Sequence, residues 1–274
     1  MIPVYNEAGR IADCLRAVAA QVIQPYEVIV VDNNSTDGTA AIARQFPFVR
    51  IVRESRQGVV YARRRGFDEA CGDVIGSLDA DTDIPVDWVR TVQRIFTEPA
   101  VNAVTGRVQY RDITLSGVVN GVDLALRRYF AWLYPTAGPT QGANMALRQE
   151  AWTRVRTSLC VKQGFHEDMD LAVHLGEAGL GVRLDERLRA TLGSRQCALD
   201  WAEFRMYAMA NPHSYRLHGL RTRSMWGAAA TVVVLYPLLR FLHQGYDAER
   251  QKFSWVTLLR GELVPRVNPA TFVD

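Results

Sequence analysis

The sequence has few cysteines, and they lie far apart. They form no Cys-x-x-Cys pair, and no histidine stands at zinc-ligand spacing from them, which argues against a zinc finger and against a disulfide framework. The four are Cys14, Cys71, Cys160 and Cys197. The net charge of +3 comes from basic residues spread along the chain, so nothing indicates a nucleic-acid partner. These absences favour a protein of a reducing cytoplasm.

The chain also lacks the run of about 20 apolar residues that a membrane-spanning helix needs. Its most apolar run, residues 225–239, is shorter, and Pro237 is expected to bend a helix there. Met1 leads almost directly into a polar motif, so we expect no signal peptide. With 274 residues, 48% of them hydrophobic, the chain is long enough for one main domain, predicted over residues 1–215, and a C-terminal tail over residues 216–274.

Two aspartates, Asp79 and Asp81, directly follow the apolar run of residues 74–78. Such a run predicts a strand buried on both faces, with the carboxylates just past its carboxyl end, where open α/β sheets bind ligands. Residues i and i+2 of an extended segment share a face, so one carboxylate can bind a divalent cation and the other a hydroxyl. Alone, an Asp-x-Asp pattern is more often a simple acidic loop.

Two earlier segments repeat this arrangement of a strand followed by polar residues. The β-branched run of residues 27–31 leads to Asp32 and then to Asn, Ser, Asp and Gly residues that favour a turn and a helix start. The chain opens on a short predicted strand that ends near Tyr5, and a helix is predicted over residues 11–22. Alternating strands and helices predict an α/β fold with a mostly parallel central sheet flanked by helices.

Five motifs, in order, resemble those of the family 2 glycosyltransferases, which transfer sugars from nucleotide-sugar donors. The resemblance covers roughly residues 1–195 and implies a GT-A type fold. The motifs are Pro3-Val4-Tyr5-Asn6-Glu7, Val31-Asp32-Asn33-Asn34-Ser35-Thr36-Asp37-Gly38-Thr39, Leu78-Asp79-Ala80-Asp81, Gly142-Ala143-Asn144-Met145-Ala146-Leu147-Arg148 and His166-Glu167-Asp168-Met169-Asp170.

The resemblance implies a role for each matching residue on the donor side. Tyr5 would stack on the nucleobase, Asp32 would accept a hydrogen bond from the base, and Asp79 would bind the ribose hydroxyls. Asp81 would hold Mg²⁺ or Mn²⁺, hard ions that prefer oxygen ligands. The other residues assigned to donor binding are Pro3, Glu7 and Arg63, the last of which would face the donor phosphates although Arg64 replaces the family's usual Asn.

The catalytic base and the acceptor side are assigned in the same way. Asp168 would remove the proton of the acceptor hydroxyl, with Glu167 beside it able to tune its acidity. The alternative for this acidic segment is a helix N-terminus, where carboxylates are favoured by the helix dipole. Gly142, Asn144 and Trp152 would lie beside the acceptor, although Trp152 is as well suited to packing against the sheet.

The predicted function is therefore metal-dependent transfer of a sugar from a nucleotide diphosphate, UDP- or GDP-linked, to an acceptor hydroxyl. One general base and no separate nucleophile favour direct displacement with inversion. The acceptor is left open among a glycan, a lipid and a small molecule. The alternatives are a non-catalytic nucleotide-sugar-binding or scaffold protein and, less favoured because a Gly-rich loop ending in Pro-Lys is missing, a sugar nucleotidyltransferase.

The tail carries a second open question. Trp226 and Tyr236 lie near the ends of the apolar run, with arginines outside it, as in helices that lie at a membrane surface and favour anionic lipid. A buried helix or a homodimer contact through residues 216–274 explains the same pattern equally well. We therefore expect a cytoplasmic protein, either free or peripheral on the cytoplasmic face of the cell membrane.

Overall fold

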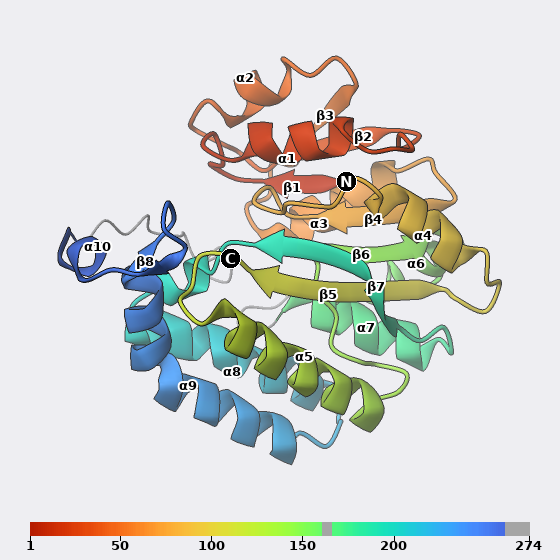
Figure 1. Ribbon diagram of the computed structural model, residues 1–274. Coiled ribbons are helices and arrows are strands. Elements are labelled where there is room, and N and C mark those ends of the chain that lie inside the picture. Colours follow the sequence, from red (N-terminus) through yellow and green to blue (C-terminus); the bar gives the residue numbers. More distant parts are fainter. Residues whose placement is uncertain (161–165, 261–274) are drawn as a thin grey trace.

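The computed structural model describes residues 1–160 and 166–260, and its centre is a twisted sheet (Figure 1). A parallel sheet of order β1-β2-β3 lies beside a mixed sheet of order β4-β6-β5-β7. Met1 joins them, because its amine donates to the carbonyl of Gly76 (2.7 Å) and its carbonyl accepts from the amide of Leu78 (3.2 Å). The strands are β1 (Ile2–Val4), β2 (Val28–Asp32), β3 (Val49–Arg53), β4 (Val74–Leu78), β5 (Ala103–Tyr110), β6 (Asn144–Arg148) and β7 (Arg183–Leu192).

Helices cover both faces of this sheet. Consecutive residues of β2 enter opposite cores: Val28 and Val30 pack with α1, α2 and α4, whereas Ile29 and Val31 pack with α3, α6 and α7. Burial on both faces explains why β2 is an unbroken apolar run. These helices are α1 (Ile11–Ala19), α2 (Thr39–Ala43), α3 (Val59–Glu69), α4 (Trp88–Phe96), α6 (Gln149–Val155) and α7 (Glu167–Glu177). The predicted α/β class is confirmed, with β6 antiparallel to both of its neighbours.

The predicted elements agree with the structure except at their ends. The helix expected over residues 11–22 ends at Ala19, because Pro25 lies close ahead and the amide of Val22 donates instead to the carbonyl of Val86 (2.8 Å). The strand expected over residues 27–31 is shifted by one residue, and the first strand is short, as predicted. Gly179, at φ +74°, ends the turn after α7 in the left-handed conformation that glycine favours.

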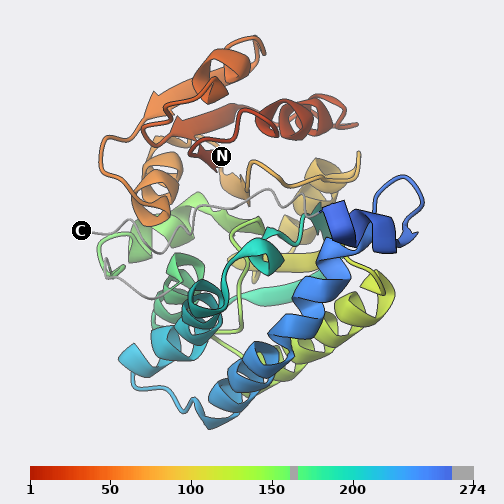
Figure 2. The ribbon, with the colours of Figure 1, turned by 90° about the vertical axis from the view of Figure 1, so that its left-hand side faces the viewer.

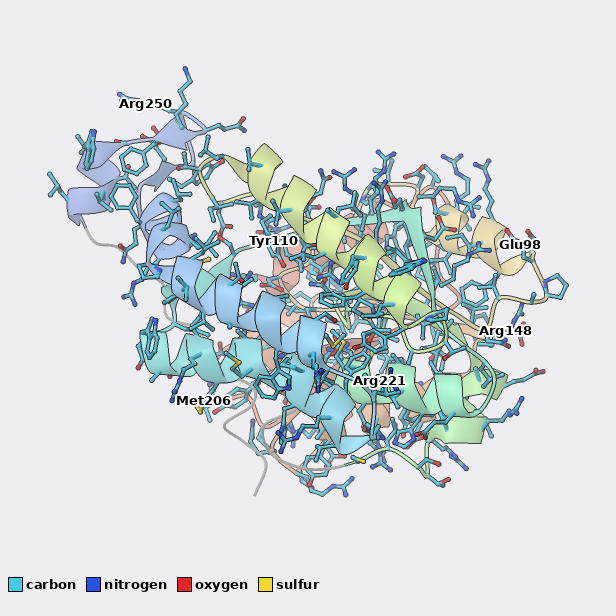
Figure 3. The ribbon with its side chains drawn as sticks, turned by 90° about the horizontal axis from the view of Figure 1, so that it is seen from below. Glu98, Tyr110, Arg148, Met206, Arg221 and Arg250 are labelled. Atoms are coloured by element: carbon cyan, nitrogen blue, oxygen red, sulfur yellow. The ribbon has the colours of Figure 1, made fainter. Side chains whose placement is uncertain are left out.

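Three long helices form a further layer next to β5 and β7: α5 (Ser116–Leu133), α8 (Trp201–Leu217) and α9 (Arg223–Gln244) (Figure 1). Seen from below, α5 and α9 run side by side, and Met206 of α8 lies on the opposite side of α9 from α5 (Figure 3). The boundary predicted at residue 215 falls inside α8. The chain continues through β8 (Tyr246–Asp247), β9 (Lys252–Phe253) and α10 (Trp255–Arg260).

Helix α9 is longer than its apolar run, because the helix continues through Arg240 to Gln244 with Pro237 inside it. By length and composition alone it could cross a membrane, and only 22% of its most apolar window is buried. One stripe of α9, including Val233 and Tyr236, packs against Phe204 of α8, with the Phe204 and Tyr236 rings stacked at 3.9 Å. The helix therefore lies along the domain and has an open apolar side.

Candidate active site

Polar side chains follow the carboxyl ends of β1, β2 and β4 at one edge of the sheet. In Figure 2 the first strands, in red, lie in the upper part of the view, above the layer of α5, α8 and α9. Tyr5 follows β1, Asp32 is the last residue of β2, and Asp79 follows β4, as the sequence predicts. Pro3 lies within β1, paired with Val31. Because carboxyl ends of neighbouring parallel strands meet at one edge, residues far apart in the chain share one site.

The loops after β1 and β2 are tied together by side-chain hydrogen bonds. The amide of Thr36 donates to Oδ1 of Asn6 (2.8 Å), and the amide of Glu7 donates to Oγ1 of Thr39 (2.8 Å). Asn6 has φ of 54°, a left-handed conformation that asparagine tolerates better than most residues. The carboxylate of Asp32 accepts from the amide of Ser35 (3.1 Å). The two loops thus form a preorganised wall of the site.

Arg63 of α3 lies at the base of the site, with only 5% of its side chain exposed. It donates to Asp79 (3.1 Å), to Glu167 (3.1 Å) and to the carbonyl of Gly142 (2.8 Å). Burial opposes its charge, but the attraction of Asp79, Glu167 and Asp168 outweighs that and raises the pKa of Arg63. Arg63 is therefore a permanent cation that holds three segments of the site together, rather than a solvated charge.

Asp168 lies in the first turn of α7, beside Arg63. Its Oδ2 accepts from the amide of Gly142 (2.9 Å), and its Oδ1 accepts from the amide of Met169 (2.8 Å). These bonds hold one carboxylate in a defined orientation at the site. Asp170 points to another side of the helix, where its carboxylate accepts from the amide of Cys160 (2.9 Å).

Arg195, which the sequence analysis did not select, closes the site from the far side. It follows β7 and bonds to both Glu7 (3.0 Å) and Asp81 (2.6 Å), which are otherwise distant from each other in the chain. All three side chains are at most 15% exposed. Burial raises the pKa of Glu7, and the Arg195 guanidinium partly offsets this shift. In the sequence, Arg195 is marked only by the neighbouring Gln196, and this pattern is too weak to identify Arg195 as a site residue.

The carboxylate oxygens at this edge of the sheet are suitable ligands for a hard divalent cation. Asp79 and Asp81 offer carboxylate oxygens, which Mg²⁺ and Mn²⁺ prefer to nitrogen or sulfur. The oxygen of Asp81 is held by Arg195, so a cation there would take the place of one guanidinium contact. His166 lies close to Glu167 and Asp168, and its ring packs against Tyr207.

The structure buries Asn144 and Trp152, which the resemblance assigns to the acceptor side. Asn144 is fully buried, where it accepts from Trp88 (2.8 Å) and donates to the carbonyl of Arg107 (3.0 Å). Trp152 is 1% exposed and donates to Asp68 (2.9 Å), so the alternative of packing against the sheet holds. Both side chains already satisfy their polar groups inside the protein, which leaves nothing to bind an acceptor.

Gly142 does lie at the site, but for a reason of packing. A Cβ atom at this position would stand 2.4 Å from the Arg63 guanidinium carbon. Only glycine lets the backbone approach Arg63 and Asp168 so closely. The loop before β6 therefore positions the two charged residues through its backbone.

Replacing Arg195 by Met should lower the free energy of unfolding by roughly 3 kcal/mol at neutral pH, because Glu7 and Asp81 lose a buried counter-ion. A carboxyl whose pKa is raised in the folded state costs stability when it ionises, so the deficit should shrink as pH falls. Urea unfolding at pH values above and below that pKa measures both effects. Arg111→Met removes an exposed arginine paired with Asp83 at 3.6 Å and should change little. An Arg195→Met deficit no larger than that of Arg111→Met would contradict the prediction.

Comparison with known families identifies the chain. A profile of glycosyl transferase family 2 matches residues 1–154, more than half of the sequence, and the chain belongs to this family. The glycosyltransferase AglE of Haloferax volcanii is 37% identical over 117 residues, 40% of this chain and 38% of AglE. The undecaprenyl-phosphate 4-deoxy-4-formamido-L-arabinose transferase of Pseudomonas fluorescens is 27% identical over 176 residues, 60% of this chain and 45% of that protein. The chain spans less than half the length of these curated relatives.

Solved structures show the same GT-A fold. Glucosyl-3-phosphoglycerate synthase from Mycobacterium tuberculosis, with phosphoglyceric acid, has a TM-score of 0.58 at 18% identity, over 81% of this chain and 80% of that one. The same enzyme with Mn²⁺, uridine diphosphate and glucosyl-3-phosphoglycerate has a TM-score of 0.52 at 19% identity, over 87% and 77%. TarS of S. aureus has 0.55 at 16% identity, over 86% and 79%.

Proposed function

We propose that this protein is an inverting glycosyltransferase that moves a sugar from a nucleotide diphosphate to an acceptor hydroxyl. The observation that carries the proposal is the placement of Asp168: its carboxylate accepts from the amide of Gly142, whose carbonyl accepts from Arg63, and Arg63 also binds Asp79 at the end of β4. Membership of glycosyl transferase family 2 supports it. One oriented carboxylate, with no second nucleophile selected at the site, matches a single displacement.

In this reaction the chain's own residues bind the donor and move one proton. The base would lie against Tyr5 and bond to Asp32, and the ribose would bind Asp79. The acceptor oxygen attacks the anomeric carbon, its proton passes to the carboxylate of Asp168, and the bond from that carbon to the diphosphate oxygen breaks. Arg63 keeps Glu167 and Asp79 in place during this step. Glu167 is thus a positioning residue, since its carboxylate is engaged by Arg63.

We also propose a divalent cation, Mg²⁺ or Mn²⁺, held by Asp81 with Asp79 nearby. When bound, it would neutralise charge on the departing diphosphate. The complexes of glucosyl-3-phosphoglycerate synthase with Mn²⁺ and uridine diphosphate support this assignment by likeness of fold.

The donor can be identified by titrating the purified protein with uridine, guanosine, thymidine and cytidine diphosphate sugars, with and without Mn²⁺. We expect tight binding of one donor, a uridine or guanosine diphosphate sugar, because Asp32 can accept from the ring N–H of either base. Release of the nucleoside diphosphate in the presence of acceptor would show transfer. Binding without release under every acceptor tested would favour the alternative of a nucleotide-sugar-binding protein, and no binding would contradict both.

For the acceptor we propose a lipid-linked or envelope glycan reached from the cytoplasmic face of the membrane. The name of the Pseudomonas fluorescens relative includes an undecaprenyl-phosphate group, which supports a lipid acceptor. The open side of α9 supports contact with a membrane surface, since Val234, Leu235 and Leu238 are 76%, 46% and 54% exposed. Because the buried stripe of α9 packs on α8, this helix would lie in the membrane surface rather than cross it.

A double substitution of Val234 and Leu238 by Gln should reduce binding to anionic lipid vesicles by about tenfold or more, since it removes apolar area from the membrane contact. Vesicle co-sedimentation measures this. Val22→Gln, at a valine that is 53% exposed on another part of the surface, is the matched control and should bind as the unchanged protein does. A protein that dimerises in solution and does not bind vesicles would contradict the membrane proposal and favour the homodimer contact through residues 216–274.

A further inference from the structure

Four metal-ligating side chains meet on the side of α7 that faces α8, away from the carboxylates of the proposed donor site. They are Cys160, Asp170, His174 and His218, and their ligand atoms all lie within 4.8 Å of one another. Asp170 and His174 are one turn apart on α7, and His218 ends α8. The packing of α7 against α8 brings His218 to the others, so the four ligands do not follow a zinc-finger spacing in the sequence.

The distances between these atoms are close to those of a tetrahedral site. The Cys160 sulfur lies 4.0 Å from Nε2 of His174, which lies 3.5 Å from Oδ1 of Asp170. Oδ1 of Asp170 is 2.8 Å from Nε2 of His218. Ligand bonds of about 2.0–2.3 Å to zinc require separations of about 3.3–3.6 Å between donor atoms. The three separations lie within about 0.5 Å of this range, and the other pairs of donor atoms lie within 4.8 Å of each other.

A carboxylate outside the cluster orients one of its ligands. Nδ1 of His174 lies 3.0 Å from Glu177, which favours the tautomer with Nδ1 protonated and leaves Nε2 with its lone pair toward the cluster. This arrangement of carboxylate, histidine and metal is typical of protein zinc sites. The cluster is also secluded, because the side chains of Asp170, His174 and His218 are 2%, 11% and 10% exposed.

We propose that Cys160, Asp170, His174 and His218 form a structural Zn²⁺ site. A thiolate and two imidazoles suit zinc far better than Mg²⁺ or Mn²⁺, which prefer the oxygen ligands of the donor site. Four protein ligands leave no open position, so the ion would cross-link rather than catalyse. It would fasten residue 160 and the end of α8 to α7, whose first turn carries Asp168. Binding would displace the thiol proton of Cys160 and replace the hydrogen bond between Asp170 and His218.

The test is zinc binding by the full chain, stripped with a chelator and titrated with Zn²⁺ against a competing indicator. We expect about one zinc per chain and a higher melting temperature with Zn²⁺ but not with Mg²⁺. Cys160→Ser and His174→Gln should abolish tight binding. Glu177→Gln should weaken it by about tenfold or more, because it removes only the orienting contact. Cys71→Ser, at an exposed cysteine, and His213→Gln, on α8 outside the cluster, are matched controls and should bind as before.

A second readout does not depend on any variant being folded. Co²⁺ in the unchanged protein should give a sulfur-to-metal charge-transfer band, and bound metal should protect Cys160 from alkylation. Cys71 should react in both states. Cys14 and Cys197 should react in neither, because burial raises the pKa of each thiol to about 12. A folded chain that binds no zinc, or whose bound cobalt shows no thiolate band, would overturn the proposal and leave the cluster as a set of hydrogen bonds.

Discussion

Asp168→Asn should lower the turnover of sugar transfer by about 10²–10⁴-fold while donor affinity stays within a few-fold of the original. In the unchanged protein the backbone amide of Gly142 donates to Oδ2 of Asp168 (2.9 Å). The Asn side chain has the shape of the carboxylate and its oxygen can still accept this bond, so the fold should persist. What it loses is the ability to take the acceptor's proton. Steady-state kinetics with the identified donor and calorimetric donor binding separate the two effects.

Glu167→Gln is the matched comparison, because it makes the same change one residue earlier. Its carboxylate is bonded to Arg63 at 3.1 Å, so the change should weaken the positioning of Arg63 and reduce turnover less than Asp168→Asn does. If Asp168→Asn retains normal turnover while Glu167→Gln loses it, the roles assigned to the two carboxylates are reversed. Loss of donor binding in Asp168→Asn would instead show that Asp168 acts on the donor.

Asp81→Ala should abolish the dependence of donor binding on Mn²⁺, with affinity in Mn²⁺ falling by roughly 100-fold, since the proposed metal loses its main carboxylate ligand. In the structure this carboxylate is bonded to Arg195, so a metal ion and Arg195 compete for it. Arg195 can still pair with Glu7 in the variant, which limits the loss of stability. Donor titration with and without Mn²⁺ measures the effect.

Asp83→Ala is a control from the same loop. The Asp83 side chain is 62% exposed and lies 3.6 Å from Arg111, whereas its backbone pairs with Thr191 and would be unchanged. Removing this carboxylate should leave metal-dependent donor binding intact. Equal losses in Asp81→Ala and Asp83→Ala would mean that the loop's overall charge matters, and an Asp81→Ala protein that still needs Mn²⁺ would place the metal elsewhere.

Much of the fold was predictable from local patterns. The run of residues 74–78 is a strand with the predicted bounds, and Asp32 and Asp79 lie at strand ends as expected. These features depend on neighbouring residues along the chain, where apolar runs and turn-forming residues act directly on the backbone. Helix ends were less predictable, because α1 stops where a long-range bond from Val22 replaces a helical one.

The direction in which a side chain points was harder to predict. Asn144 lies in the motif that the resemblance assigns to the acceptor side and Trp152 follows it on α6, yet both side chains turn into the core. Adjacent residues of a strand face opposite sides, so membership of a motif does not show which side faces the ligand. The same limit applies to Gly142, which lies at the site because Arg63 packs against its backbone.

The motifs alone determined the α/β class, the family resemblance and the edge of the sheet where polar side chains follow the strands, because each of these depends on a short stretch of the chain. Packing alone decided that Arg63 binds Asp79 and Glu167, and that Arg195 joins Glu7 to Asp81. It also gathered Cys160, Asp170, His174 and His218. These contacts join residues on separate elements, and burial of unpaired charges is costly enough that folding must bring such partners together.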